Sequence, residues 1–179
     1  MSIPNTTEAL LIRGAHLNDL SAIMLLYEQA IAFQKKNNYI GWEKIDEAFI
    51  RADLEQGLLY KISSDNRLVA AFCTCYSDPL IWREMERGDA FYLHRLVIDP
   101  VLRGGRMFER VLQWALEHAR QKGLSNIRMD TWADNEKLIR YYEGYGFRFV
   151  EAYQTPDDPA LPVQHRKLNV ALLERSISL

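Results

Sequence analysis

In the first half of the chain, the spacing of the apolar residues changes between that of a helix and that of a strand, and short polar segments separate the two. Apolar residues recur at helical spacing between Leu17 and Phe33, and a second helix is expected from about Lys44 to Gln56, ending at Gly57. Strands are expected at Ala9–Ile12, Leu58–Ser63 and Leu68–Tyr76.

The second half carries the clearest pattern. Phe91–Ile98 is expected to form a strand, and Met107–Gln121 an amphipathic helix that stops at Gly123. The remaining elements are a strand at Asn126–Trp132, a helix at Asp134–Tyr145, and strands at Phe147–Tyr153 and Gln164–Leu172. The order β-α-α-β-β-β-α-β-α-β-β predicts an α/β protein with helices on a mixed sheet, without a regular βαβ repeat.

Composition narrows the class of protein. A chain of 179 residues is expected to form a single domain, residues 1–179, with 22 Lys and Arg against 24 Asp and Glu and a net charge of −2. This balance argues against nucleic-acid binding, which needs a basic surface. Apolar runs are too short to span a membrane, and the basic, apolar start of a signal peptide is missing. We therefore expect a cytoplasmic protein.

The two cysteines, Cys73 and Cys75, lie two residues apart in a predicted strand and so point to the same face. A disulfide across so short a loop would be strained, and a metal site would need further ligands nearby. Reduced, half-buried thiols are expected, and no metal.

A charged, glycine-containing loop joins the central strand to the long helix. Its residues Arg103, Gly104, Gly105 and Arg106 precede unpaired helical N–H groups, where the helix dipole favours an anion. The loop could thus hold a phosphate or pyrophosphate. The alternative is an ordinary turn with solvated arginines. Neither the P-loop pattern nor a G-x-G-x-x-G fingerprint is present.

A second motif follows downstream, where Asn135 precedes Tyr142, Gly146 and Phe147 at intervals of 7, 11 and 12 residues. With the Pro100-x-x-Arg103 loop, this pattern resembles the GNAT superfamily of N-acetyltransferases over nearly the whole chain, roughly residues 9–172. The chain differs from the family pattern at Arg106 and Phe108, where glycines are usual, and at Leu138, where a small residue is usual.

The resemblance implies a GNAT-like α/β (α+β) fold, with a central, mixed, mostly antiparallel sheet of six to seven strands and about four flanking helices. It also implies acetyl-CoA as co-substrate. The pantetheine arm would pair with the free edge of the central strand, the pyrophosphate would lie on the loop and helix amides, and Asn135 would hydrogen-bond the arm. The implied coenzyme contacts are Leu96, Val97, Ile98, Arg103, Gly104, Gly105, Arg106, Met107, Phe108 and Asn135.

The implied reaction is direct attack of an amine on the thioester. Tyr142 stands at the family's general-acid position and would protonate the thiolate, although it could instead be a core residue. His94 stands near a position where many relatives carry Glu, and an imidazole can accept the ammonium proton. Glu43, Glu84, His165 or a water chain are alternatives, as is a structural role for His94.

The acceptor is expected to be a primary amine of a small molecule or peptide. Tyr39, Trp42 and Trp82 lie in segments that border the acceptor side of this fold, where they form an aromatic wall or pack ordinarily. A non-catalytic acyl-CoA sensor is the alternative function. The protein is expected to be a monomer or homodimer.

Overall fold

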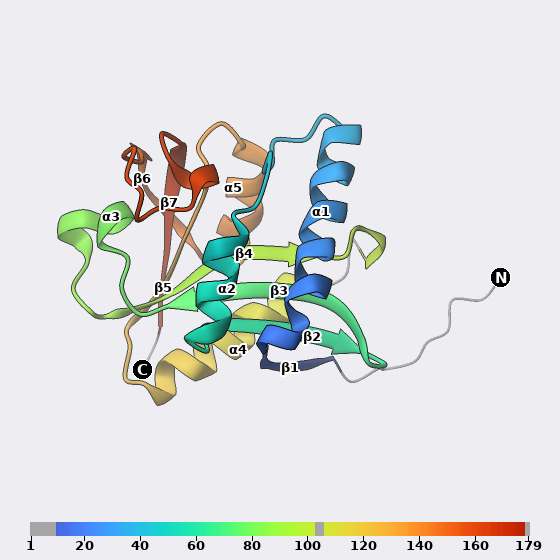
Figure 1. Ribbon diagram of the computed structural model, residues 1–179. Coiled ribbons are helices and arrows are strands. Elements are labelled where there is room, and N and C mark those ends of the chain that lie inside the picture. The colour runs from blue at the N-terminus through green and yellow to red at the C-terminus, as the bar shows by residue number, and fades with distance from the viewer. Residues whose placement is uncertain (1–9, 103–105, 178–179) are drawn as a thin grey trace.

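The computed structural model describes residues 10–102 and 106–177. Within them, seven strands form one sheet in the order β1-β2-β3-β4-β5-β7-β6 (Figure 1). Neighbouring strands are antiparallel except for the parallel pair β4 and β5. The strands are β1 (Leu11–Gly14), β2 (Leu59–Ser64), β3 (Arg67–Cys75), β4 (Ala90–Ile98), β5 (Asn126–Trp132), β6 (Arg148–Gln154) and β7 (Asn169–Ser176).

Five α-helices flank this sheet in the described residues, one more than the sequence predicts. They are α1 (Leu20–Lys36), α2 (Glu47–Glu55), α3 (Pro79–Trp82), α4 (Met107–Gln121) and α5 (Glu136–Glu143). The extra helix is the single turn α3. None of the described helices is both long and apolar enough to cross a membrane.

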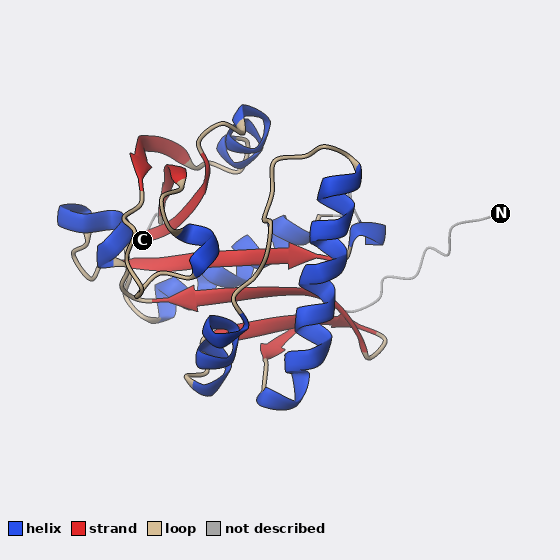
Figure 2. Cartoon of the chain, turned by 45° about the horizontal axis from the view of Figure 1, so that its top comes forward, coloured by secondary structure: helices blue, strands red, loops and turns tan. Residues whose placement is uncertain are grey.

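The helices cover both faces of the sheet. Helices α1 and α2 lie on one face, whereas α4 and α5 lie on the other (Figures 1 and 2). Ile23 and Ile50 anchor the first layer against β2 and β3, and Val111 and Phe108 anchor the second. The predicted fold is therefore confirmed.

Two predicted boundaries are wrong near the C-terminus. The last strand was expected at Gln164–Leu172, but Val163–His165 forms a 3-10 turn and the strand runs from Asn169 to Ser176, beyond the predicted core. Pro162 begins that turn, and Lys167 adopts a left-handed φ of 52°, so the chain reverses before it can pair. Helix α5 begins after the Asn135 cap and ends at Glu143, before the C-cap Gly144, so it is shorter than predicted at both ends.

A β-bulge bends the central strand. His94 pairs with Cys73 and Val97 with Ala71, so Arg95 and Leu96 together face one residue of β3. Arg95 has a φ of 50°, a conformation that costs a non-glycine residue about 1–3 kcal/mol. It is held there because its guanidinium pairs with Asp53 and donates to the Cys73 sulfur at 3.4 Å.

The sheet opens beyond this point. The β4–β5 ladder covers only Ala90–Tyr92, after which β5 turns away from β4 (Figure 1). The edge of β4 that faces β5 is therefore free of β5 from His94 to Ile98. Cys73 is buried, Cys75 is partly buried, and both are free thiols, as expected.

Candidate functional site

A cavity of about 530 Å³ occupies the opening between β4 and β5. Its wall comes from both strands and from α1, α4 and α5. Eight residues predicted to bind the coenzyme or act in catalysis line it: His94, Leu96, Val97, Ile98, Arg106, Met107, Phe108 and Tyr142. Arg103, Gly104 and Gly105 lie outside the described residues. The structure thus gathers these eight residues around one space.

One end of the cavity offers unpaired backbone groups. Here the free edge of β4 meets the start of α4, where the first helical N–H groups have no intrahelical partner. The Met107 and Phe108 side chains are buried and pack into the core, so they fix the helix in place. Arg106 is 84% exposed and lies 3.5 Å from Glu109, which leaves its guanidinium at the surface of the cavity.

Asn135 has a structural role in the free protein. Its side-chain oxygen accepts a hydrogen bond from the Leu138 N–H at 3.2 Å and so caps α5. Among the described residues, the cavity lining includes Leu138 but does not extend to Asn135. The expected contact of Asn135 with the coenzyme stays a prediction.

Tyr142, on α5, lines the cavity. Its ring packs edge-on against Phe108 with centroids 4.8 Å apart, and the residue is 9% exposed. Burial, followed by the effects of Tyr141 and Asp130, raises the pKa of the Tyr142 phenol. The phenol therefore stays protonated at neutral pH, as a general acid must.

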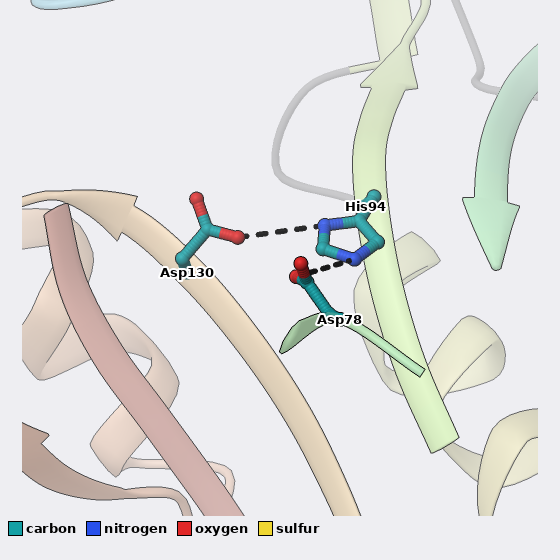
Figure 3. A group of neighbouring side chains, drawn as sticks. All are labelled: Asp78, His94 and Asp130. Atoms are coloured by element: carbon teal, nitrogen blue, oxygen red, sulfur yellow. Dashed lines mark ion pairs between the residues drawn. The ribbon is translucent and has the colours of Figure 1, made fainter. Parts of the chain in front are cut away.

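His94 is held between two carboxylates (Figure 3). Its Nε2 lies 3.3 Å from Asp78 and its Nδ1 lies 3.4 Å from Asp130. Burial opposes protonation, but Cys75, Asp130 and Asp78 outweigh it and raise the His94 pKa well above its ordinary value. The free protein therefore carries His94 as an imidazolium at neutral pH.

Asp130 links the groups of this cluster. Burial favours its neutral form, yet His94, His165 and Arg95 lower its pKa, so the carboxyl is ionised. One oxygen faces His94, and the other points away from the ring (Figure 3). Asp78, His94 and Asp130 are close enough to suggest cation ligands. Both ring nitrogens, however, face carboxylates as donors, and a nitrogen that carries a proton cannot ligate a metal.

The three alternative candidates for the general base lie in different parts of the structure. His165 lines a small chamber beside His94, but burial lowers its pKa to about 4, which makes it a weak base. Glu84 has a side chain that is 79% exposed, and Glu43 borders a different groove beside α1. Of the three, His165 alone lines the small chamber beside His94, and none of them lines the main cavity.

The predicted aromatic wall is only partly correct. Trp42 lines the cavity, and its ring centroid is 5.7 Å from that of Trp132. Trp82, the last residue of α3, is fully buried beneath the Arg128 guanidinium at 4.6 Å, so of the two alternatives it follows ordinary packing and does not line the cavity. Tyr39 is 51% exposed and packs on Phe33.

Comparison with known proteins decides the family. The family model described as "Acetyltransferase (GNAT) family" matches residues 23–147. The chain belongs to the GNAT acetyltransferase family. Its resemblance to that family and its fold class are therefore confirmed.

Individual relatives agree with this assignment. The uncharacterized N-acetyltransferase YesJ of Bacillus subtilis (strain 168) is 28% identical over 107 residues, which are 58% of this chain and 59% of YesJ. The chain thus aligns with less than two thirds of the length of that relative.

Solved structures share the GNAT fold over nearly the full chain. A GNAT family acetyltransferase from Listeria monocytogenes 4b F2365 superimposes with a TM-score of 0.76 at 19% identity, covering 96% of this chain and 99% of that one. The yncA protein of Salmonella typhimurium, solved with its cofactor acetyl-CoA, gives a TM-score of 0.64 at 18% identity, covering 95% of each chain. At such identities the likeness concerns the fold alone.

In this GNAT chain, sequence reasoning missed the side chains that surround His94. Asp78, Asp130, Thr131 and Trp132 were not assigned to the site, although Asp130 is the one acidic residue in β5. That charge was the available signal. Nothing local indicates that Asp78, which lies 16 residues before His94, returns to contact it.

Proposed function

We propose that this protein transfers the acetyl group of acetyl-CoA to a primary amine. The observation that carries the proposal is one continuous cavity that joins the free β4 edge and the α4 N-terminus to Tyr142, His94 and Asp130. A thioester and an amine can therefore meet beside an acid and a charged cluster. Proximity of this kind supplies a large part of the rate enhancement in bimolecular reactions.

The coenzyme is assigned to the backbone end. The free edge from Leu96 to Ile98 offers N–H and C=O groups to the amide-bearing pantetheine arm. The pyrophosphate is assigned to the start of α4, where unpaired N–H groups and the helix dipole favour an anion. Arg106, whose side chain is exposed, adds a positive charge at the same place. The acetyl-CoA complex of the yncA protein, which has the same fold, supports this choice of donor.

The chemical step then involves two proton transfers. The amine nitrogen bonds to the thioester carbon, the carbon–sulfur bond breaks, and the leaving sulfur takes the phenolic proton of Tyr142. The second proton released by the nitrogen restores that phenol. The first proton, lost by the ammonium before attack, is assigned to His94 and leaves to solvent. His94 must itself first lose its proton, because the free protein holds it as an imidazolium.

A thiol-release assay across a panel of primary amines tests the proposal. We expect amine-dependent release of coenzyme A and acetyl-CoA-dependent thermal stabilisation, which amounts to about 2.7 kcal/mol at a ligand concentration 100 times the Kd. Arg106 and Phe108, which replace family glycines, favour the sensor alternative. Stabilisation by acetyl-CoA without turnover of any amine would establish that alternative and overturn the transferase.

A further inference from the structure

A small chamber of about 40 Å³ continues from the cavity beyond His94. Asp130, Thr131, Trp42 and Trp132 line both spaces. A buried water needs about 10–15 Å³ of such space, so the chamber can hold an ammonium group and the carbon attached to it. A larger molecule bound there would extend back into the main cavity.

The fixed charges around the chamber leave one negative charge uncompensated. Arg95 pairs with Asp53, and the His94 imidazolium lies between Asp78 and Asp130. Two cations therefore face three carboxylates, since the buried His165 is neutral with a pKa of about 4. A bound cation beside Asp130 would balance the cluster.

Two further features of the wall suit an ammonium group. The Trp42 and Trp132 rings lie 5.7 Å apart at an angle of 59°, and indole faces attract cations. Thr131 also lines the chamber, and its hydroxyl oxygen is a buried polar atom with no hydrogen-bond partner. The same rings give the entrance an apolar surface.

The wall offers little to a carboxylate on the acceptor. Among the described residues of the chamber, Arg95 and His94 are the cations, and both are already engaged by carboxylates. An α-amino acid would bring its own carboxylate close to Asp130. Its binding would therefore be disfavoured by repulsion that no free cation offsets.

We propose that the acceptor is a small primary amine that carries an apolar or aromatic group and no neighbouring carboxylate, and that Asp130 binds its ammonium in the chamber lined by Trp42 and Trp132. Asp130 also acts electrostatically on Tyr142, so an amine bound there lies on the side of the cavity where the acid stands. This inference rests on the proposed function only in that the bound amine is taken as the acetyl acceptor. Binding itself is testable without turnover.

Three probes of matched shape isolate the recognised group: benzylamine, the neutral benzyl alcohol, and phenylglycine, which adds a carboxylate to benzylamine. Their Kd values are measured on the full chain by indole fluorescence and by calorimetry, with and without acetyl-CoA. We expect benzylamine to bind at least about 10-fold more tightly than either analogue, the scale of a charge-assisted hydrogen bond. Equal binding of benzyl alcohol or phenylglycine would overturn the proposal.

Variants locate the contact. Asp130→Asn should weaken benzylamine binding about 10-fold or more and leave benzyl alcohol unchanged. The matched control, Glu117→Gln on the exposed face of α4, should change neither. A folded Asp130→Asn protein with unaltered benzylamine affinity would contradict the proposal. If Asp130→Asn does not fold, Trp42→Leu is the deciding variant. A loss of benzylamine affinity with acetyl-CoA binding retained would support the proposal. Unchanged benzylamine affinity would refute the proposal.

The outcomes separate this inference from the proposed function. Asp130-dependent binding of benzylamine without any release of coenzyme A would refute the transferase and leave the ammonium site standing. Turnover of other amines, with no binding of benzylamine, would refute the ammonium site and leave the transferase standing.

Discussion

The two ends of the cavity are built in different ways. The end that we propose for the coenzyme presents the backbone of two short segments, Leu96–Ile98 and the start of α4, which follow each other closely in the chain. The end that we propose for the acceptor presents single side chains from distant segments, among them Trp42, His94 and Asp130. The first end depends on local backbone geometry, and the second depends on how the strands are arranged.

This difference has a consequence for specificity. Backbone amides at a helix start bind phosphate groups whichever side chains surround them, so that end suits a donor shared by many enzymes. Side chains at the other end can change without altering the sheet. The same scaffold can therefore keep its donor while its acceptor varies.

The largest expected effect lies where the two ends meet. Tyr142→Phe removes the acid and should lower turnover by about 10²-fold or more, while acetyl-CoA affinity stays near wild type. Steady-state kinetics and calorimetry measure the two quantities. Tyr141→Phe, on the same helix, is the matched control. Unchanged turnover in Tyr142→Phe would make this tyrosine a packing residue only.

A change at the coenzyme end should affect donor affinity alone. Arg106→Ala should weaken acetyl-CoA binding by about 10- to 100-fold, with a larger effect at low salt, because a charge-assisted contact is lost. Turnover at saturating coenzyme should hardly change.

Two further variants sharpen that result. Arg110→Ala, an exposed arginine on the same helix, should bind normally. Arg106→Gly restores the family residue and should recover affinity through closer backbone contact. Wild-type binding by both Arg106 variants would show a solvated side chain with no role in the site.

The charge on His94 should make the acceptor end sensitive to pH. The folded-state pKa lies above the unfolded value of about 6.5, so the ion pairs with Asp78 and Asp130 contribute fully below pH 6.5. Their contribution disappears as pH rises through the folded-state pKa. The Tm difference between wild type and His94→Gln should therefore shrink above pH 6.5. A difference that is constant with pH would argue against a charged His94.

The smallest expected effect concerns the cap of α5. Asn135→Ala should cost about 1 kcal/mol, or about 2–4 °C in Tm, because the Leu138 N–H loses its acceptor. Asn135→Asp keeps an acceptor oxygen and should preserve stability. A fall in acetyl-CoA affinity beyond the stability loss would show that Asn135 also contacts the coenzyme.

Much of the fold follows from local pattern. Helix α4 occupies the predicted residues because its apolar stripe is regular and Gly123 adopts a φ of 70° at its end. The bulge at Arg95 has no such signal, since it depends on partners from α2 and β3. The predicted start of β7 is wrong for a similar reason, because the turn before this strand competes with strand pairing.

The candidate site likewise has parts that local pattern predicts and parts that depend on contacts between distant segments. The strand and helix of the coenzyme end could be placed from spacing alone, and Tyr142 and His94 do line the predicted space. The contacts of His94 with Asp78 and Asp130 could not be predicted from spacing, because they require that β4 and β5 separate beyond their short ladder. Trp82 looked equivalent to Trp42 in sequence and lies in a different layer.

An initial-rate matrix with acetyl-CoA and a turned-over amine both varied tests the central claim most directly. One cavity that holds both substrates predicts a ternary complex and direct transfer, which give intersecting double-reciprocal lines. Parallel lines would indicate a covalent acetyl-enzyme, formed before the amine binds, and would contradict the account.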